Sequence, residues 1–259
     1  FCAALTSFYR QIPVGHVEAG LRTWDKFSPF PEEINRVMTS RIADLHFTPT
    51  RRAKENLLKE GVPEDRVFVT GNTVVDALLF AVEKVRLDPP EIPGLPRDLL
   101  SEGNRRLVLI TGHRRESFGD GLSNICHAIS VLSNRFRDVA FVYPVHLNPR
   151  VREPVFDILA GIPNVHLIEP LSYLAFVMLM NRSTVIMTDS GGVQEEAPGL
   201  GKPVIVMRDT TERPEGVEIG IARIVGTSRQ SIIDCTAKLL NDGSVHEVTS
   251  QTTNPYGDG

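Results

Sequence analysis

Residues 184–207 read TVIMTDSGGVQEEAPGLGKPVIVM and hold the clearest structural pattern in the chain. Their first apolar run, Val185–Met187, is typical of a strand that is buried on both faces. A turn of small and polar residues follows at Thr188–Gly192, and the residues from Val193 onward are compatible with a helix. A second apolar run, Pro203–Met207, comes after a Gly-Lys-Pro turn. Strand, turn, helix and strand in this order predict a βαβ unit.

The turn of this unit has the features of an anion-binding site. It places the backbone N–H groups of Ser190, Gly191 and Gly192 at a helix N-terminus, where unsatisfied donors and the helix dipole favour a phosphate. Glu195 and Glu196 lie one turn further on, where a carboxylate can hold the hydroxyl groups of a ribose. The pattern is also compatible with an ordinary tight turn that precedes a solvated acidic helix face.

The rest of the chain alternates in the same way. Helical and extended patterns follow one another on both sides of residues 86–105, a segment dense in proline and charge that is typical of a linker. The alternation predicts an α/β fold with parallel sheets and right-handed crossovers. Residues 72–259 hold enough strands for a complete doubly wound domain, and residues 1–71 hold part of one. The expected strands are Ile12–Glu18, Leu45–Thr48, Val67–Thr70, Leu107–Thr111, Ala140–Val145, Val165–Ile168, Thr184–Thr188, Val204–Met207 and Arg223–Val225.

Composition limits the functional class. With 259 residues, of which 41% are hydrophobic and 23% charged, the chain has the composition of a globular protein. Its net charge of −4 argues against a general nucleic-acid binder, which carries a basic patch. No apolar run approaches the roughly 20 residues that cross a membrane. The cysteines Cys2, Cys126 and Cys235 are scattered and form no zinc motif, so we expect a cytoplasmic protein without a bound metal.

Polar side chains follow the expected strands of the larger domain, at the edge where open α/β sheets bind ligands. The run GHRRES (112–117) supplies His113, a titratable group, and two permanent cations, Arg114 and Arg115, which suit a diphosphate. His146 follows the next strand, and the expected register points it into the same cleft. The alternative is surface charge with a capping histidine in the first run and a structural histidine in the second.

Two further features of this domain have two interpretations each. The loop RDTTERPE (208–215), which contains Arg213, packs cationic, acidic and hydroxyl side chains into a few residues after a strand. It is either a substrate-binding loop or a solvated surface loop. Phe176 lies on the apolar face of an expected helix, Leu174–Met180, and is either a core residue or a platform on which a nucleotide base stacks.

Carboxylates stand out in the smaller domain. Its first expected strand ends at Glu18, and Glu32 and Glu33 follow a proline-marked turn, Ser28–Pro31. A glutamate at the end of a strand and another at the start of a helix can flank a cleft as an acid and base pair. Glu32 and Glu33 also suit the first turn of a helix because of the helix dipole alone. Spacing does not choose between these interpretations.

Seven ordered motifs resemble those of the non-hydrolysing UDP-N-acetylglucosamine 2-epimerases of bacteria. They are GHVEAGLRT (15–23), PEEINR (31–36), GNTVVDAL (71–78), TGHRRESF (111–118), YPVHLNP (143–149), TDSGGVQEEAPGLGKPV (188–204) and MRDTTERPE (207–215), and the likeness continues to the terminal NPYGDG. The resemblance implies two Rossmann-like domains that face each other across a cleft, the GT-B-like architecture, with the N-terminal domain incomplete. It also implies reversible interconversion of UDP-GlcNAc and UDP-ManNAc without NAD or another cofactor, by a homodimer that serves cell-surface polysaccharide synthesis.

The chemistry of this family explains the residue types. The C2 proton is not next to a carbonyl, so the family first expels UDP from C1 with loss of that proton, which gives 2-acetamidoglucal. UDP then adds back, and a proton is delivered to the opposite face of C2. By resemblance, Glu18, Glu32 and His113 match catalytic residues. The resemblance also implies a ribose contact from Glu196 and uracil stacking on Phe176. It implies that His146 contacts a ligand, which includes an activating second UDP-GlcNAc. The implied diphosphate contacts are Arg114, Ser190, Gly191, Gly192 and Arg213.

The family carries a further N-terminal segment before the point that matches Phe1, including a catalytic aspartate that this sequence lacks. Phe1 also falls inside an expected helix, so we expect an N-terminally truncated fragment that binds UDP and turns over poorly on its own. Three alternatives stay open: a hydrolysing 2-epimerase, a GT-B glycosyltransferase, and a UDP-sugar binding module without turnover. We expect neither a nucleic-acid nor a membrane partner.

Overall fold

A computed structural model of the chain describes residues 1–100, 106–241 and 254–258. The chain divides into two compact units. Unit 1 consists of Phe1–Ala77, Thr210–Arg213 and Asn254–Gly259, and unit 2 consists of Leu78–Asp209 and Pro214–Thr253. Unit 1 therefore includes two short segments from late in the chain. The domains expected from the sequence, residues 1–71 and 72–259, remain a proposal.

The larger sheet lies in unit 2. Within the described residues its strands are β4 (Arg106–Thr111), β5 (Val139–Pro144), β6 (Val165–Ile168), β7 (Val185–Thr188), β8 (Val204–Val206) and β9 (Ala222–Ile224). They are parallel and lie in the order β6-β5-β4-β7-β8-β9, with Leu109 of β4 opposite Ile186 of β7. In this doubly wound order the chain starts in the middle of the sheet and reverses direction between β4 and β7. Ligands bind at such a switch point, beyond the carboxyl ends of the strands.

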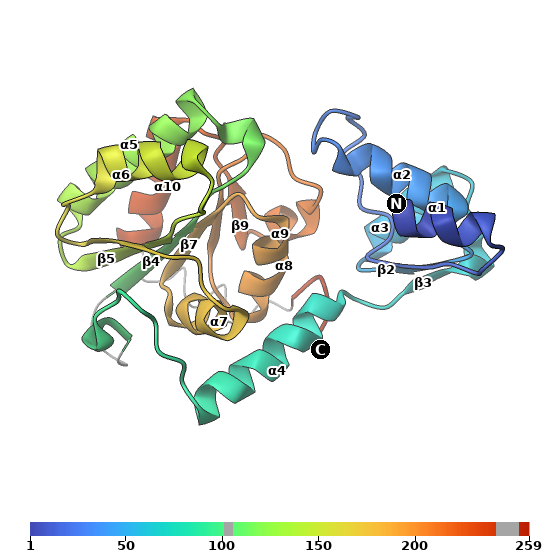
Figure 1. Ribbon diagram of the computed structural model, residues 1–259, viewed down its shortest axis with the longest axis horizontal. Coiled ribbons are helices and arrows are strands. Elements are labelled where there is room, and N and C mark those ends of the chain that lie inside the picture. The colour runs from blue at the N-terminus through green and yellow to red at the C-terminus, as the bar shows by residue number, and fades with distance from the viewer. Residues whose placement is uncertain (101–105, 242–253, 259) are drawn as a thin grey trace. The chain divides into compact units, whose positions relative to one another are not determined.

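Helices cover both faces of this sheet (Figure 1). On one face lie α5 (Asp120–Arg135), α6 (Pro149–Leu159) and α10 (Arg229–Asn241), and on the other lie α7 (Tyr173–Arg182) and α8 (Gly191–Gly199). Successive residues of β4 point to opposite faces, so Val108 and Ile110 enter the first core while Leu107 and Leu109 enter the second. All four are fully buried, which stabilises the unit by roughly 1.5–3 kcal/mol per side chain. The short helix α9 (Pro214–Glu218) follows β8.

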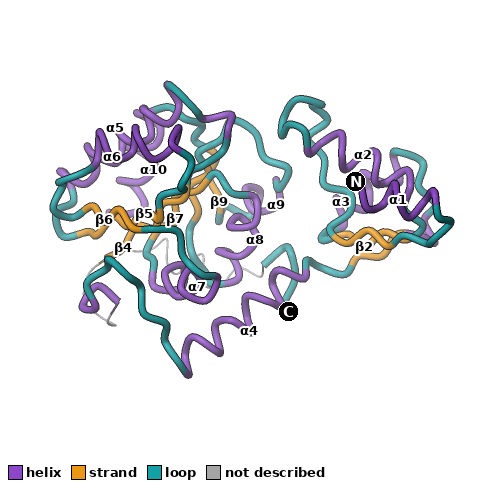
Figure 2. Tube along the Cα trace, viewed as in Figure 1, coloured by secondary structure: helices purple, strands orange, loops and turns teal. Residues whose placement is uncertain are grey.

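Unit 1 contains a smaller parallel sheet in the order β1-β2-β3. Figure 2 draws its strands in orange beside the label β2. Its strands are β1 (Gly15–Val17), β2 (Leu45–Thr48) and β3 (Val67–Val69), and its helices are α1 (Cys2–Tyr9), α2 (Glu32–Ile42) and α3 (Arg51–Lys59). α3 packs on β2 and β3, and its buried Leu57 meets Ala19 and Val67. Thr50 caps α3 by accepting a hydrogen bond from Ala53 N through Oγ1 at 3.1 Å. α4 (Thr73–Leu87) begins in unit 1 and continues into unit 2.

The strands that the sequence predicts are all present, with small differences at their ends. The largest difference is in the first strand, expected at Ile12–Glu18 and observed at Gly15–Val17. Glu18 has a φ of +63°, which no strand residue adopts, so the chain leaves the sheet one residue earlier than predicted. The predicted linker, residues 86–105, begins in the last turn of α4 and runs through a proline-rich stretch to a 3₁₀ helix at Arg97–Leu100. Residues 101–105 lie outside the described residues. Among the described helices, none has the length and apolarity needed to cross a membrane.

Candidate functional site

The switch point of the larger sheet is organised by Asp189. This residue follows β7, is fully buried, and accepts hydrogen bonds through Oδ2 from the backbone N–H groups of His113 and Arg114, each at 2.7 Å. Beside it, the hydroxyl groups of Thr111 and Thr188 at the ends of β4 and β7 lie 2.6 Å apart. Because hydrogen bonds to a carboxylate are strong, this buried group fixes the loop after β4 against β7.

His113 lies in this loop against His146, which follows β5. The two imidazole rings stack with centroids 5.4 Å apart, and His113 Nδ1 is 3.7 Å from Asp189 Oδ1. Burial lowers the pKa of His113 below its usual 6.5; the Asp189 carboxylate raises it, and His146 and Arg114 lower it. The lowered pKa favours the neutral form of His113, which can both donate and accept a hydrogen bond.

The N-terminus of α8 lies directly after Asp189. Ser190 is the residue before the helix, its backbone N–H donates to Thr188 Oγ1 at 3.0 Å, and Gly191 and Gly192 form the first turn. The helix dipole directs its positive end to this turn, as the sequence pattern predicts. β7 and α8 place this turn at the edge of the sheet that also carries His113. The anion contact itself remains a prediction.

Glu196, in the next turn of α8, is buried and accepts a hydrogen bond through Oε1 from Tyr173 Oη at 2.8 Å. Burial raises the pKa of Glu196, and the Tyr173 hydrogen bond lowers it. Burial and the same hydrogen bond raise the pKa of Tyr173. Phe176 lies one turn after Tyr173 in α7, is half-buried and packs against the core of unit 2. Its stacking role remains a prediction.

In unit 1, Glu18 and Arg213 lie in contact. Glu18 Oε1 accepts hydrogen bonds from Asn72 Nδ2 and from Arg213 Nη2, both at 3.1 Å. Arg213 is buried, and its Nη1 donates to Glu212 Oε1 at 2.5 Å. The sequence predicts a diphosphate contact for Arg213; in the structure its guanidinium group holds two carboxylates, and the diphosphate contact remains a prediction.

Glu32 and Glu33 begin α2, where sequence alone left their roles open. Glu33 is buried and accepts hydrogen bonds from the backbone N–H groups of Thr23 and Trp24, at 3.2 and 3.0 Å. Glu33 therefore fixes the loop that precedes α2. Glu32 is the partly buried first residue of the helix, and its acid or base role remains a prediction.

The sequence did not single out four residues that organise these contacts. Asp189 lies within residues 184–207, directly after the predicted strand. Its position at the carboxyl end of a strand is a signal that could have identified it. Tyr173, Asn72 and Glu212 act through contacts between segments far apart in the sequence, which spacing does not reveal. Of the described residues, no group of three or more histidine, cysteine, aspartate or glutamate side chains is arranged to hold a metal ion.

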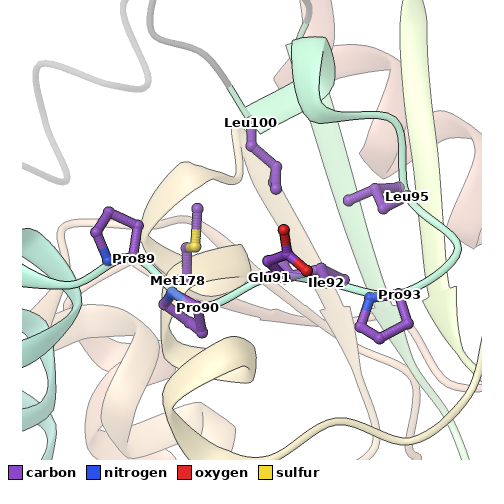
Figure 3. A pocket seen from close by; sticks show the side chains of 8 residues that line it. All are labelled: Pro89, Pro90, Glu91, Ile92, Pro93, Leu95, Leu100 and Met178. Atoms are coloured by element: carbon purple, nitrogen blue, oxygen red, sulfur yellow. The ribbon is translucent and has the colours of Figure 1, made fainter.

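A separate pocket of about 590 Å³ lies in unit 2 between the proline-rich stretch and α7 (Figure 3). Pro89, Pro90, Pro93 and Met178 are among its lining residues. Its lining is mostly apolar and includes none of the predicted site residues. The pocket is therefore distinct from the contacts around Asp189 and Glu18.

The order of the larger sheet and the polar cluster at its switch point define a doubly wound α/β protein with a candidate ligand site at this edge. The whole chain, residues 1–259, matches the UDP-N-acetylglucosamine 2-epimerase family. The chain belongs to this family. The predicted isomerase activity class and the α/β class with Rossmann-like parallel sheets are confirmed by this match and by the relatives below.

Curated relatives agree with this assignment. A probable UDP-N-acetylglucosamine 2-epimerase of Ralstonia solanacearum is 57% identical over 260 residues, which cover 98% of this chain and 68% of the relative. The UDP-N-acetylglucosamine 2-epimerase of Escherichia coli K12 is 52% identical over 257 residues, covering 99% of this chain and 68% of the relative.

Solved structures agree as well. The UDP-GlcNAc 2-epimerase of Neisseria meningitidis, crystallised with UDP-GlcNAc, is 49% identical with a TM-score of 0.94 over 99% of this chain and 69% of that one. The enzyme of Methanocaldococcus jannaschii, in complex with UDP-GlcNAc and UDP, is 38% identical with a TM-score of 0.83 over 98% of this chain and 68% of that one.

Proposed function

We propose that this chain binds UDP-N-acetylglucosamine at the switch point of the larger sheet and interconverts UDP-GlcNAc and UDP-ManNAc at C2. The observation that carries the proposal is the buried Asp189, which holds the His113–Arg114 loop beside the N-terminus of α8. A diphosphate at this position meets helix N–H groups, a permanent cation and a neutral imidazole. The relative from Neisseria meningitidis is described as bound to UDP-GlcNAc, which supports the choice of ligand.

Each predicted contact then has a chemical task. Ser190, Gly191 and Gly192 bind the diphosphate with Arg114, and Glu196 accepts hydrogen bonds from the ribose. Tyr173 already occupies one oxygen of Glu196, so it orients this carboxylate for the sugar. Phe176 provides a flat apolar surface for the uracil ring.

The reaction proceeds in two stages. In the first, the C1–O bond breaks, UDP departs with the bonding electrons, a carboxylate removes the C2 proton, and a C1=C2 double bond forms in 2-acetamidoglucal. In the second, a UDP oxygen adds to C1 and a proton is delivered to the opposite face of C2. We assign the acid and base roles to Glu18 and Glu32, and stabilisation of the departing diphosphate to His113 and Arg114.

The comparisons do not favour a hydrolysing epimerase or a glycosyltransferase. We further propose a homodimer, a cytoplasmic location, a role in polysaccharide precursor synthesis, and a second UDP-GlcNAc that activates the enzyme through a site that includes His146. The Methanocaldococcus jannaschii structure, described as a complex with UDP-GlcNAc and UDP, supports the presence of two nucleotide ligands in the family.

Proton NMR of UDP-GlcNAc in D₂O with this chain tests the proposal. Deuterium at C2 together with the anomeric signal of UDP-ManNAc supports elimination and re-addition. UDP binding without exchange supports the nucleotide site but contradicts the proposed interconversion by this chain. The absence of both exchange and UDP binding overturns the proposal, and free ManNAc replaces it with hydrolysis.

A further inference from the structure

The NPYGDG motif near the end of the chain has no task in the function proposed above. Its Tyr256 is fully buried in unit 1, among residues that are distant in sequence. The phenol Oη donates a hydrogen bond to the backbone carbonyl of Arg213 at 3.1 Å, and the Tyr256 carbonyl accepts one from Asn72 N at 2.7 Å. One residue thus fixes the backbone of two others, Arg213 and Asn72.

Both of these residues hold Glu18. Asn72 Nδ2 and Arg213 Nη2 donate to the same oxygen, Glu18 Oε1. Among the described residues Oε2 has no hydrogen bond, so it is the oxygen that is available for proton transfer. The Glu18 side chain is 43% exposed. The backbone of Glu18 has a positive φ, a conformation that persists only where the surrounding structure enforces it. Without the two donors this carboxylate has no fixed direction.

The two donors are themselves held from other sides. Asn72 Oδ1 accepts a hydrogen bond from Val74 N at 3.2 Å in the first turn of α4. Arg213 Nη1 is bound to the buried Glu212, which is 3.5 Å from Arg36 of α2. Gly71, with a φ of +74°, lets the backbone approach Tyr256, since a Cβ there would lie 3.1 Å from the Tyr256 carbonyl oxygen. The segments around Asn72, Arg213 and Tyr256 therefore form one connected support beneath Glu18.

We propose that Tyr256 is a positioning residue for the Glu18 carboxylate, which it holds through Asn72 and Arg213. The inference rests on the proposed function, in which Glu18 transfers the C2 proton. Catalysis requires that a proton-transfer group keep its geometry, and a loosened carboxylate lowers kcat more than it weakens substrate binding. Tyr256 itself touches neither Glu18 nor the substrate in this scheme.

The test uses the full chain with glutamate labelled with ¹³C at the side-chain carboxyl. The Glu18 signal is identified by its loss in Glu18→Gln. In Tyr256→Phe, which removes only the hydroxyl, we expect the Glu18 signal to move while the signals of glutamates outside this support stay in place. The matched control is Tyr9→Phe, since Tyr9 is a 76% exposed residue of α1, and it leaves the Glu18 signal unchanged. An unmoved Glu18 signal in Tyr256→Phe overturns the proposal, and so does displacement of the glutamate signals throughout the chain.

A second variant covers the case in which Tyr256→Phe does not fold. Asn72→Asp keeps an acceptor for Val74 N but replaces the Nδ2 donor with a carboxylate oxygen, so the Glu18 signal moves here as well. In the D₂O exchange assay, Tyr256→Phe lowers kcat about threefold to tenfold with KM unchanged. Exchange that is absent even from the unaltered chain, with the NMR response of Glu18 intact, contradicts the proposed function and leaves the positioning by Tyr256 standing.

Discussion

Asp189 is fully buried and binds two successive backbone N–H groups, those of His113 and Arg114, through one carboxylate oxygen. A hydrogen bond to a charged acceptor contributes more than one to a neutral acceptor. The charge of Asp189 therefore stabilises the position of the loop that carries the two predicted ligand contacts. The sequence places Asp189 at the end of a strand, but only the structure shows that its task is to hold a neighbouring loop.

We expect Asp189→Asn to weaken UDP binding roughly fivefold to thirtyfold, because a neutral amide oxygen holds the loop less strongly. Isothermal titration of UDP into the variant measures the change. The control is Asp157→Asn, at an exposed position on α6, with unaltered affinity. Equal affinity in the two variants would show that the loop does not depend on the Asp189 charge.

His16 of β1 gives a residue-level prediction about stability. Burial, with the neighbouring His46 charge as the next cause, lowers the pKa of His16 from 6.5 to about 4. The unfolded chain therefore binds more protons than the folded chain between these pH values, and the free energy of unfolding falls as pH drops from 6.5 towards 4. In His16→Gln we expect the loss between pH 7 and pH 5 to shrink by roughly 1 kcal/mol, after allowing for solvent screening.

Urea unfolding of His16→Gln and of the unaltered chain at pH 7 and pH 5 measures this effect. His127→Gln, at an exposed histidine of α5, is the control and keeps the full pH dependence. A pH dependence of His16→Gln that matches the control is incompatible with a neutral, half-buried His16.

At the scale of elements, the turn after β1 depends on a close approach to α3. Gly20 has a φ of +86°, and a Cβ at this position would lie 2.1 Å from the carbonyl oxygen of Ala53. The Gly20 carbonyl in turn accepts a hydrogen bond from Asn56 Nδ2 of α3 at 3.0 Å. The turn that carries Glu18 is therefore fixed against α3, and a side chain at residue 20 forces the two apart.

Gly61 provides a matched comparison, because its φ is +85° and a Cβ there would have no heavy atom within 4 Å. We expect Gly61→Ala to lower the free energy of unfolding by about 1 kcal/mol, the cost of positive φ for alanine. Gly20→Ala adds the collision with backbone and lowers the free energy by about 3 kcal/mol or more. Urea denaturation of both variants measures the two decreases in the free energy of unfolding. Equal decreases would mean that α3 moves away from residue 20 without a loss of stability.

Most elements were predictable because their patterns are local. The apolar run of β7, the small-residue turn and the following helix lie next to one another in the sequence, so predicting this β7–α8 unit needed no long-range information. The positive φ of Glu18 is different. The turn that carries Glu18 contacts α3 through Gly20, and a strand pattern that continues through Glu18 gives no indication of this positive φ.

At the scale of the whole chain, sequence reasoning predicted the α/β class and the family through ordered motifs. It did not predict that Thr210–Arg213 and the segment from Asn254 belong to the same compact unit as Glu18. Arg213 is 195 residues from Glu18 in the sequence, and the segment from Asn254 lies further still along the chain. Periodicity and spacing report local structure, and such contacts arise only when the chain has folded.

We propose that the switch point of the larger sheet binds the diphosphate of a uridine nucleotide. Calorimetric titration of the chain with UDP, and in parallel with uridine, tests it most directly. We predict saturable UDP binding and at least about tenfold weaker binding of uridine, because the α8 N-terminus and Arg114 act on the phosphates. Equal affinity for the two ligands, or no binding of UDP, would contradict the claim.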